Sequence, residues 1–290
     1  MDDRDALSRF TTIGTGGAPR RLVRPESLDE LQEALASAAA AGLAVEAIGL
    51  GSNVLAHDGG VEAMVVKLAG GLAAVRVEGD VVVAGGGATN AVCLHRARDA
   101  GLGGFEFASA IPGTTGGGVR MNAGAYGREF RDVVVDAVVV DAAGVRTLSV
   151  DELDLSYRHS SLQPGQVVAE VRLRLEPSST AEVKALTAEL LAQRKSTQPT
   201  NKRTFGSVFK NPEGSPGAGR MIEDCGLKGH AIGGAVVSPR HANFIENAGA
   251  ASSADCLALM AEARRRVFER YGHRLEHEVR FLGPLVLPEL

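Results

Sequence analysis

Two glycine-rich segments contain the residue types best suited to bind a phosphate-rich ligand. They consist of Gly49, Leu50, Gly51, Ser52 and Asn53, and of Ala110, Ile111, Pro112, Gly113 and Thr114 followed by Gly116 and Gly117. Small residues let main-chain N–H groups approach a diphosphate, and Ser, Thr and Asn side chains add donors. The first segment alone would suit a tight turn about equally well, whereas the glycine density of the second is hard to explain as a mere linker. Two of them in separate parts of the chain predict one long cofactor lying between them, and a flavin dinucleotide has the required size.

Other phosphate-binding patterns are excluded. The first segment is not the dinucleotide fingerprint G-x-G-x-x-G, and no G-x-x-x-x-G-K-[ST] occurs in the chain. The glycines are unusually many, 36 in 290 residues, and most clusters fall in the first half. Clustered glycine indicates a backbone that approaches something closely. The first half is therefore expected to bind the cofactor.

Composition limits the function classes. With 44% hydrophobic and 23% charged residues the chain is typical of a folded globular protein, and 290 residues favour several domains. A net charge of −4 gives no electrostatic signature for nucleic acid or an anionic membrane. Met1 to Phe10 contain no apolar signal region, so we expect a cytoplasmic protein. The cysteines Cys93, Cys225 and Cys256 form no C-x-x-C pair and are expected to be reduced packing residues, with no metal site.

Periodicity predicts an α+β chain of three parts. Residues 1–72 contain a helix over 28–41, opened by the capping box Ser27 to Glu30, and strands at 45–50 and 64–68. Residues 73–195 contain strands near 75, 81–83, 133–140, 145–148 and 167–175. They also contain a helix over 89–100 and a second helix that begins at Pro177 to Thr180 and ends near residue 194. Residues 196–290 contain helices near 220–225 and 254–271 and strands at 235–237 and 279–282. Gln198-Pro199-Thr200 follows the second boundary.

Several motifs in order resemble one known family. They include Thr12-Ile13-Gly14-Thr15-Gly16-Gly17, Gly49 to Leu55, Ile111 to Thr114, Asn122-Ala123-Gly124-Ala125-Tyr126-Gly127, Tyr157-Arg158, Gly206 to Pro212, His241 to Ile245 and Leu275 to Val279. From about Phe10 to Gly283 the chain resembles the UDP-N-acetylenolpyruvoylglucosamine reductases (UDP-N-acetylmuramate dehydrogenases, the MurB family), in their shorter, type II-like form. The resemblance implies a vanillyl-alcohol-oxidase/PCMH-type fold, with two FAD-binding subdomains and a C-terminal α+β substrate-binding domain.

The resemblance also implies the reaction and the cofactor site. FAD would take hydride from NADPH and pass it to the enolpyruvyl group of UDP-N-acetylglucosamine enolpyruvate, giving UDP-N-acetylmuramate for the peptidoglycan cell wall. Both glycine segments would hold the FAD diphosphate, with Asn122 and Gly124 nearby. The expected organism is a bacterium that makes peptidoglycan, and the enzyme is expected to act as a monomer.

Three residues would carry the second half of the reaction. Arg158 would hold the substrate carboxylate, Ser207 would protonate the α-carbon, and Glu278 would orient the carboxylate. Without the family, these residues would be an exposed charge, a hydrogen-bonded serine and an exposed acid. Glu276 is the alternative to Glu278, which we prefer because it directly precedes the valine of the motif.

Five further residues are expected near the substrate by the resemblance or by their spacing from Ser207. They are Tyr157, Lys210, Asn211, His241 and Asn243. A lone histidine is more often structural, and Lys210 would also fit a surface turn. A basic cluster of Arg194, Lys195, Lys202 and Arg203 suits a helix C-terminus or a diphosphate equally well.

The chain departs from the family at two positions and leaves rival functions open. Phe205 stands where the family commonly has a small residue, and Thr12 stands where asparagine is frequent. The chain between Arg158 and Ser207 lacks the tyrosine-bearing loop of the longer family type. The main rival is another FAD-dependent oxidoreductase of the same fold. A flavin-binding module without turnover and a flavin-free UDP-sugar transferase are further alternatives.

Overall fold

The computed structural model describes residues 5–290, so part of the charged N-terminal segment lies outside the described residues. The chain divides into two compact units. The first unit comprises the residues up to Arg20, Gly51–Glu62 and Lys195–Leu290, and the second comprises Arg21–Leu50 and Ala63–Arg194. The first glycine segment is therefore shared, with Gly49 and Leu50 in the second unit and Gly51 to Asn53 in the first.

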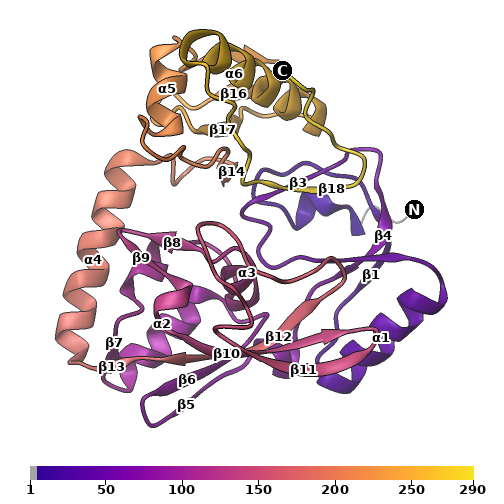
Figure 1. The fold of residues 1–290 in the computed structure, drawn as a ribbon, viewed down its shortest axis with the longest axis vertical. Coiled ribbons are helices and arrows are strands. Elements are labelled where there is room, and N and C mark those ends of the chain that lie inside the picture. Colours follow the sequence, from indigo (N-terminus) through magenta and orange to yellow (C-terminus); the bar gives the residue numbers. More distant parts are fainter. Residues whose placement is uncertain (1–4) are drawn as a thin grey trace. The chain divides into compact units, whose positions relative to one another are not determined.

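The second unit is built on a five-stranded antiparallel sheet in the order β11-β10-β12-β6-β5 (Figure 1). Its elements are α1 (Leu28–Ala40), β2 (Ala44–Ala47), β5 (Val75–Glu78), β6 (Val81–Gly85), α2 (Asn90–Asp99), β7 (Leu102–Gly103), α3 (Thr115–Arg120), β8 (Gly124–Ala125), β9 (Arg128–Glu129), β10 (Val134–Asp141), β11 (Gly144–Ser149), β12 (Val167–Arg174) and β13 (Glu176–Pro177). Three elements span the division between the units: β1 (Pro19–Val23), β4 (Val61–Val66) and α4 (Thr180–Thr197). A second sheet has the order β1-β4-β2.

Two apolar clusters stabilise this unit. One joins α2 and β6, β10 and β12 to three phenylalanines, Phe105, Phe107 and Phe130, which pack edge to face with ring centroids 5.5–6.2 Å apart. The other joins Leu31 and Leu35 of α1 to β4, β10 and β12. Burial of these side chains supplies most of the free energy that holds the sheet and helices together. The predicted cofactor residues of this unit are thus attached to a well-packed base.

The first unit packs two helices against a four-stranded antiparallel sheet in the order β14-β17-β16-β15. Its elements are β3 (Val54–Ala56), β14 (Thr204–Ser207), α5 (Ala218–Asp224), β15 (Ala231–Ile232), β16 (Ala235–Val237), β17 (Phe244–Asn247), α6 (Ser253–Tyr271) and β18 (Arg280–Leu282). In Figure 1, β3 and β18 run side by side, and they pair in parallel from Val54 with Arg280 to Ala56 with Leu282. Segments from both ends of the chain therefore lie beside one another here.

Most predicted elements are confirmed. The helix opened by Ser27 begins at Leu28, and the Ser27 hydroxyl accepts a hydrogen bond from the Glu30 N–H. The long C-terminal helix has a reciprocal capping box between Ser252 and Asp255, and it ends at Tyr271, followed by the capping residue Gly272 with φ +69°. The division of residues 1–195 into two subdomains at 72 stays a prediction. Within the described residues, no helix is both long and apolar enough to cross a membrane.

The glycine-rich segment after Pro112 contains an unpredicted helix, α3. Its N-cap is Thr114, and its glycines allow close packing rather than a free loop. A Cβ on Gly118 would lie 2.1 Å from the Phe130 ring, and one on Gly116 would lie 2.8 Å from the Gly86 carbonyl oxygen. Glycine has a low helix propensity, so tertiary packing decides this element.

Candidate functional site

The two predicted glycine segments meet in the second unit around a cavity of about 80 Å³. Predicted residues that line it are Gly49, Leu50, Thr114, Gly116 and Gly117. A Cβ on Gly49 would lie 2.5 Å from Thr114 Oγ1, so only glycine allows the two segments to come this close. This contact joins residues 65 positions apart in the sequence, and it supports one ligand site built from both segments.

The cavity also contains residues that the sequence analysis did not assign. They are Lys67, Gly86, Gly87, Arg120 and Gln166, with apolar residues from β2, β4 and β12. Gly86 and Gly87 belong to a glycine cluster visible in the sequence, Gly85 to Gly87. A Cβ on Gly86 would collide with the Val168 carbonyl oxygen, so this cluster serves close packing of the strands beneath the cavity.

Lys67 directly follows strand β4 and reaches the first glycine segment. Its Nζ donates a hydrogen bond of 2.6 Å to the Gly49 carbonyl oxygen. Burial lowers the pKa of Lys67, and the positive charge of Arg24 lowers it further. The sequence signal that could have identified Lys67 is a single charged residue directly after an apolar strand. Lys67 fixes Gly49 and places a positive charge at the cavity.

The second glycine segment is held by Asn90, at the start of α2. Its Nδ2 donates to the Ile111 carbonyl oxygen at 3.0 Å, and its main-chain N–H donates to Gly113 at 3.1 Å. The chain around Pro112 is therefore fixed from behind. The cavity wall also includes Gly117, where a Cβ would meet only Thr114 Oγ1 at 3.6 Å. Gly117 thus leaves open space beside the cavity, which suits the diphosphate of FAD.

Asn122 and Gly124 support a neighbouring catalytic candidate. Asn122 is fully buried, and its amide donates to the Ser156 carbonyl oxygen at 2.9 Å and accepts from the Arg131 N–H at 3.0 Å. The Gly124 carbonyl oxygen accepts a 3.0 Å hydrogen bond from Arg158 Nη2. Both residues therefore position the turn that carries Arg158.

Arg158 is held in a strained conformation. Its φ is +53°, and Asn122 and Tyr126 of the Asn122 to Gly127 motif have φ +37° and +54°. Left-handed backbone at such residues costs about 1–3 kcal/mol each, and this strain is concentrated at functional sites. The guanidinium lies 5.0 Å from the centre of the Tyr157 ring, and Tyr157 is 48% exposed. The turn thus presents an oriented guanidinium beside an exposed ring.

Ser207 and Glu278 lie on neighbouring segments of the first unit. Ser207 ends β14, and the Glu278 N–H donates to the carbonyl oxygen of Val208 at 2.9 Å. The Lys210 N–H donates to the Glu276 carbonyl oxygen at 2.9 Å, so the two segments continue as an antiparallel pair. The segments that carry the proposed proton donor and the preferred carboxylate therefore lie side by side.

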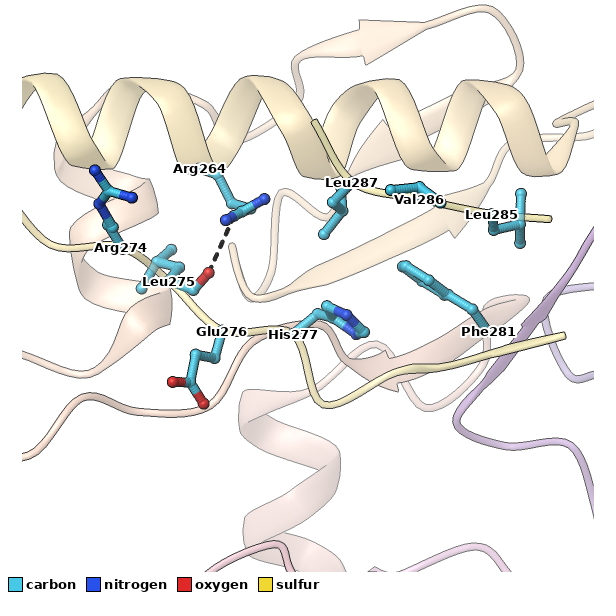
Figure 2. A pocket seen from close by; sticks show the side chains of 9 residues that line it. All are labelled: Arg264, Arg274, Leu275, Glu276, His277, Phe281, Leu285, Val286 and Leu287. Carbon is cyan, nitrogen blue, oxygen red and sulfur yellow. Dashed lines mark hydrogen bonds between the residues drawn. The ribbon is translucent and has the colours of Figure 1, made fainter. Parts of the chain in front are cut away.

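The two candidate glutamates differ in exposure. Glu276 is 75% exposed at its side chain and forms an ion pair of 3.3 Å with Lys210. Glu278 is only partly exposed. Figure 2 shows the side chains of Glu276 and His277 leaving the chain in different directions, with His277 turned toward Phe281. Glu276 therefore pairs with Lys210 at an exposed position, and the preference for Glu278 as the catalytic carboxylate stays a prediction.

Of the other residues expected near the substrate, several have structural partners. Asn211 Oδ1 accepts from the Ala218 N–H at 2.9 Å at the start of α5. Asn243 is 4% exposed, and its amide bonds both the N–H and the carbonyl oxygen of Phe209. Burial is the main factor that lowers the pKa of His241, whose Nδ1 accepts from the Asn243 N–H. Asn243 and His241 therefore support the strand after Ser207.

A larger cavity of about 510 Å³ lies elsewhere in the first unit (Figure 2). It is lined by α6, the C-terminal segment and the His277–Phe281 stack, whose centroids are 4.3 Å apart. Arg264 projects into this region, but it donates to the carbonyl oxygens of Leu275 and Pro288. This arginine therefore holds the C-terminal segment in place.

The two departures from the family motif have defined structural roles. Thr12 Oγ1 donates to the Thr204 carbonyl oxygen at 2.6 Å, so it ties the N-terminal segment to β14. Phe205 is fully buried in the apolar cluster of the first unit. Of the basic cluster, Arg194 and Lys195 lie in the last turn of α4, and Arg203 packs against Gly14.

The cysteines are free, and their thiols are expected to react slowly. Burial raises the pKa of both Cys93 and Cys256 to about 12, and it also raises the pKa of Cys225. At pH 8 the thiolate fraction at Cys93 would then be about 10⁻⁴, against roughly a quarter in an unfolded chain. We expect a thiol reagent at pH 8 to label the native protein far more slowly than the urea-unfolded protein. Equal labelling rates would contradict the packing role.

Among residues 5–290, no group of three or more His, Cys, Asp or Glu side chains could hold a metal ion.

Comparison with known proteins identifies close relatives along nearly the whole chain. Residues 198–282 match the family described as UDP-N-acetylenolpyruvoylglucosamine reductase, C-terminal domain, and residues 19–149 match the family described as FAD binding domain. A UDP-N-acetylenolpyruvoylglucosamine reductase of Paramagnetospirillum magneticum is 42% identical over 278 residues, which cover 96% of this chain and 90% of that protein. One from Anaeromyxobacter dehalogenans is 43% identical over 288 residues, covering 99% and 87%. The crystal structure of the reductase from Thermus caldophilus superposes with a TM-score of 0.84 at 35% identity, covering 96% of this chain and 97% of that one.

Proposed function

From the premise that the chain belongs to the UDP-N-acetylenolpyruvoylglucosamine reductase family, we propose that it reduces UDP-N-acetylglucosamine enolpyruvate to UDP-N-acetylmuramate for peptidoglycan synthesis. It is an FAD-dependent oxidoreductase with the vanillyl-alcohol-oxidase/PCMH-type FAD-binding fold and a C-terminal substrate-binding domain, as the sequence predicts. NADPH would be the reductant, as the resemblance to this family implies. The observation that best supports the proposal is the pairing of the Ser207 and Glu278 segments beside each other in one unit.

The residues around the cavity of the second unit fit FAD. Gly49 and Leu50 with Ala110 to Thr114, Gly116 and Gly117 would hold the diphosphate, and Gly51 to Asn53 would extend this binding loop. Lys67 would hold Gly49 in place and contribute positive charge toward the phosphates. Bound FAD would supply hydride transfer from NADPH to the enolpyruvyl double bond.

Three residues would manage the carboxylate and the proton. The Arg158 guanidinium would bind the enolpyruvyl carboxylate and stabilise negative charge that develops as hydride reaches the β-carbon. The Ser207 hydroxyl would then donate its proton to the α-carbon, which is strongly basic at that stage. The Glu278 carboxylate would orient the substrate from the paired segment. A weak acid such as the Ser207 hydroxyl would suffice for this protonation, provided that it is correctly placed relative to the α-carbon.

Accessible side chains near the catalytic candidates would contact the sugar and diphosphate of the substrate. Tyr157 offers an exposed ring, and the Lys210 ammonium, which pairs with Glu276 here, would suit the diphosphate of the substrate. We propose direct substrate contact for Tyr157, Lys210 and Asn211. His241 and Asn243 are assigned to support of the Ser207 strand, because the amide of Asn243 is occupied by Phe209.

A product assay tests the proposed function. Purified protein with FAD, NADPH and UDP-N-acetylglucosamine enolpyruvate should consume one NADPH per molecule of sugar nucleotide. Mass spectrometry should show a product two hydrogen masses heavier than the substrate. A protein that oxidises NADPH with no heavier sugar nucleotide would contradict the proposal and favour another FAD-dependent oxidoreductase.

Arg158→Lys is expected to slow sugar reduction about 10- to 100-fold while NADPH still reduces the flavin at the normal rate. A lysine keeps the charge but cannot make two parallel hydrogen bonds to a carboxylate. Stopped-flow absorbance of each half-reaction measures both effects. Arg146→Lys is the matched control, because Arg146 pairs with Asp141 on the exposed β10–β11 hairpin. Equal effects of the two substitutions would remove Arg158 from substrate binding.

We also propose a cytoplasmic location, since NADPH and UDP-sugars are cytoplasmic metabolites, and a monomer without nucleic-acid or membrane partners. The net charge of −4 supports the lack of a nucleic-acid partner. Light scattering of the purified protein measures the oligomeric state.

A further inference from the structure

The backbone directly before Ser207, the proposed proton donor, departs from regular strand geometry. Gly206, directly before Ser207, has φ +76°. The pairing of β14 with β17 shifts register between Thr204 and Ser207, as in a β-bulge. Bulges redirect a side chain and leave part of the ladder unpaired. The Phe205 and Ser207 carbonyl oxygens therefore need partners outside the regular ladder.

One side-chain amide provides both partners. Asn53 Nδ2 donates to the Phe205 carbonyl oxygen at 2.9 Å and to the Ser207 carbonyl oxygen at 3.0 Å. A Cβ at Gly206 would lie 3.6 Å from this nitrogen and 3.2 Å from the Ser52 carbonyl oxygen. Asn53, at the end of the first glycine segment, thus bridges the two carbonyl oxygens on either side of Gly206.

Asn53 also contacts the segment that carries Glu278. Its main-chain carbonyl oxygen accepts a 3.0 Å hydrogen bond from the Arg280 N–H, two residues after Glu278. On the other side of Ser207, Asn243 fixes Phe209, and the Val208 N–H donates to the Asn243 carbonyl oxygen at 2.9 Å. Asn53 therefore bonds both to the Ser207 segment and to the Glu278 segment.

We propose that the Asn53 side chain is a positioning residue for proton transfer, holding Ser207 at the correct place relative to Glu278. This inference rests on the proposed function, and it changes the expected use of Asn53 from a cofactor side-chain ligand to a support of Ser207. A contact of Asn53 with the cofactor would then have to come from its main-chain N–H. Proton transfer depends steeply on geometry. Loss of the two Asn53 hydrogen bonds should therefore slow proton transfer from Ser207 more than hydride transfer from NADPH.

Two substitutions of similar size test the proposal. Asn53→Leu removes all polar atoms, and Asn53→Asp keeps the shape but replaces the two N–H donors by an oxygen. Each should slow reoxidation of reduced flavin by the enolpyruvyl sugar at least tenfold, leave reduction by NADPH within about twofold, and leave the FAD dissociation constant within about threefold. Hydrogen exchange followed by mass spectrometry, on protein without and with FAD, should show faster exchange in residues 204–210.

Asn247→Leu is the matched control. The Asn247 amide likewise bonds main chain in the same unit, at Ile13, Gly249 and Ala251, but it does not contact Ser207. It should change the two half-reactions by the same factor, if at all. An Asn53 variant that loses FAD affinity, slows both half-reactions equally, or leaves exchange in residues 204–210 unchanged would overturn the proposal. If the wild-type enzyme itself ignores the sugar, the proposed function fails instead, and the exchange measurement still decides whether Asn53 holds Ser207.

Discussion

Ser207→Ala is expected to leave flavin reduction by NADPH intact and to slow reoxidation by the enolpyruvyl sugar by about 10²- to 10⁴-fold. The range is that of a lost general acid. Ser207 lies at the end of β14, where the Asn53 and Asn243 amides hold the chain on both sides. Removal of one hydroxyl changes no backbone hydrogen bond in this arrangement, so the fold and the cofactor site should be preserved. Anaerobic stopped-flow absorbance of the flavin band measures each half-reaction separately.

Ser215→Ala provides the control for this substitution. Ser215 is in the same unit, and its hydroxyl contacts His273 rather than the Ser207 strand. It should leave both half-reactions near their normal rates. Normal turnover by Ser207→Ala would show that another group protonates the α-carbon. Equal slowing of both steps would indicate a structural defect.

Gly117→Ala is expected to raise the stability of the cofactor-free protein while lowering FAD affinity at least tenfold. Alanine in a helix is favoured over glycine by about 0.8–1 kcal/mol. Its methyl group would meet only Thr114 Oγ1 at 3.6 Å within the protein, so nothing in the fold opposes it. The same methyl would occupy space beside the cavity that we assign to the diphosphate. Thermal unfolding without FAD and fluorescence titration with FAD measure the two opposite effects.

Gly116→Ala separates packing from ligand binding. A Cβ at Gly116 would lie 2.8 Å from the Gly86 carbonyl oxygen and 3.2 Å from that of Val168. This variant should therefore lose stability before any ligand is added, despite having the same helix propensity. If Gly117→Ala binds FAD as tightly as the wild type, the cavity is not the diphosphate site.

The sequence predicts this fold best where local signals and packing agree. Ser27 before an apolar-periodic stretch predicts α1, and a capping box with a terminal glycine delimits α6. It misses α3 because four consecutive residues with poor helix propensity become helical only against Phe130 and Gly86. Local propensity cannot encode such a contact.

The same limit applies to the site. Glycine spacing predicts two cofactor segments, but it cannot show that Gly49 lies against Thr114 or that Lys67 bonds Gly49. Asn53, Asn122 and Asn243 read as ligand-binding residues because an amide can serve a ligand or a backbone equally well. Their partners are the carbonyl and N–H groups of segments that carry Ser207 and Arg158. Only the tertiary structure separates these two uses.

An anaerobic spectroscopic titration tests the central claim most directly. Protein loaded with FAD should lose its oxidised flavin band on addition of NADPH, and the band should return when UDP-N-acetylglucosamine enolpyruvate is added, with UDP-N-acetylmuramate as the product. A bleached protein that does not respond to the sugar would contradict the assignment of the substrate. A protein that takes up no FAD would contradict the cofactor site itself.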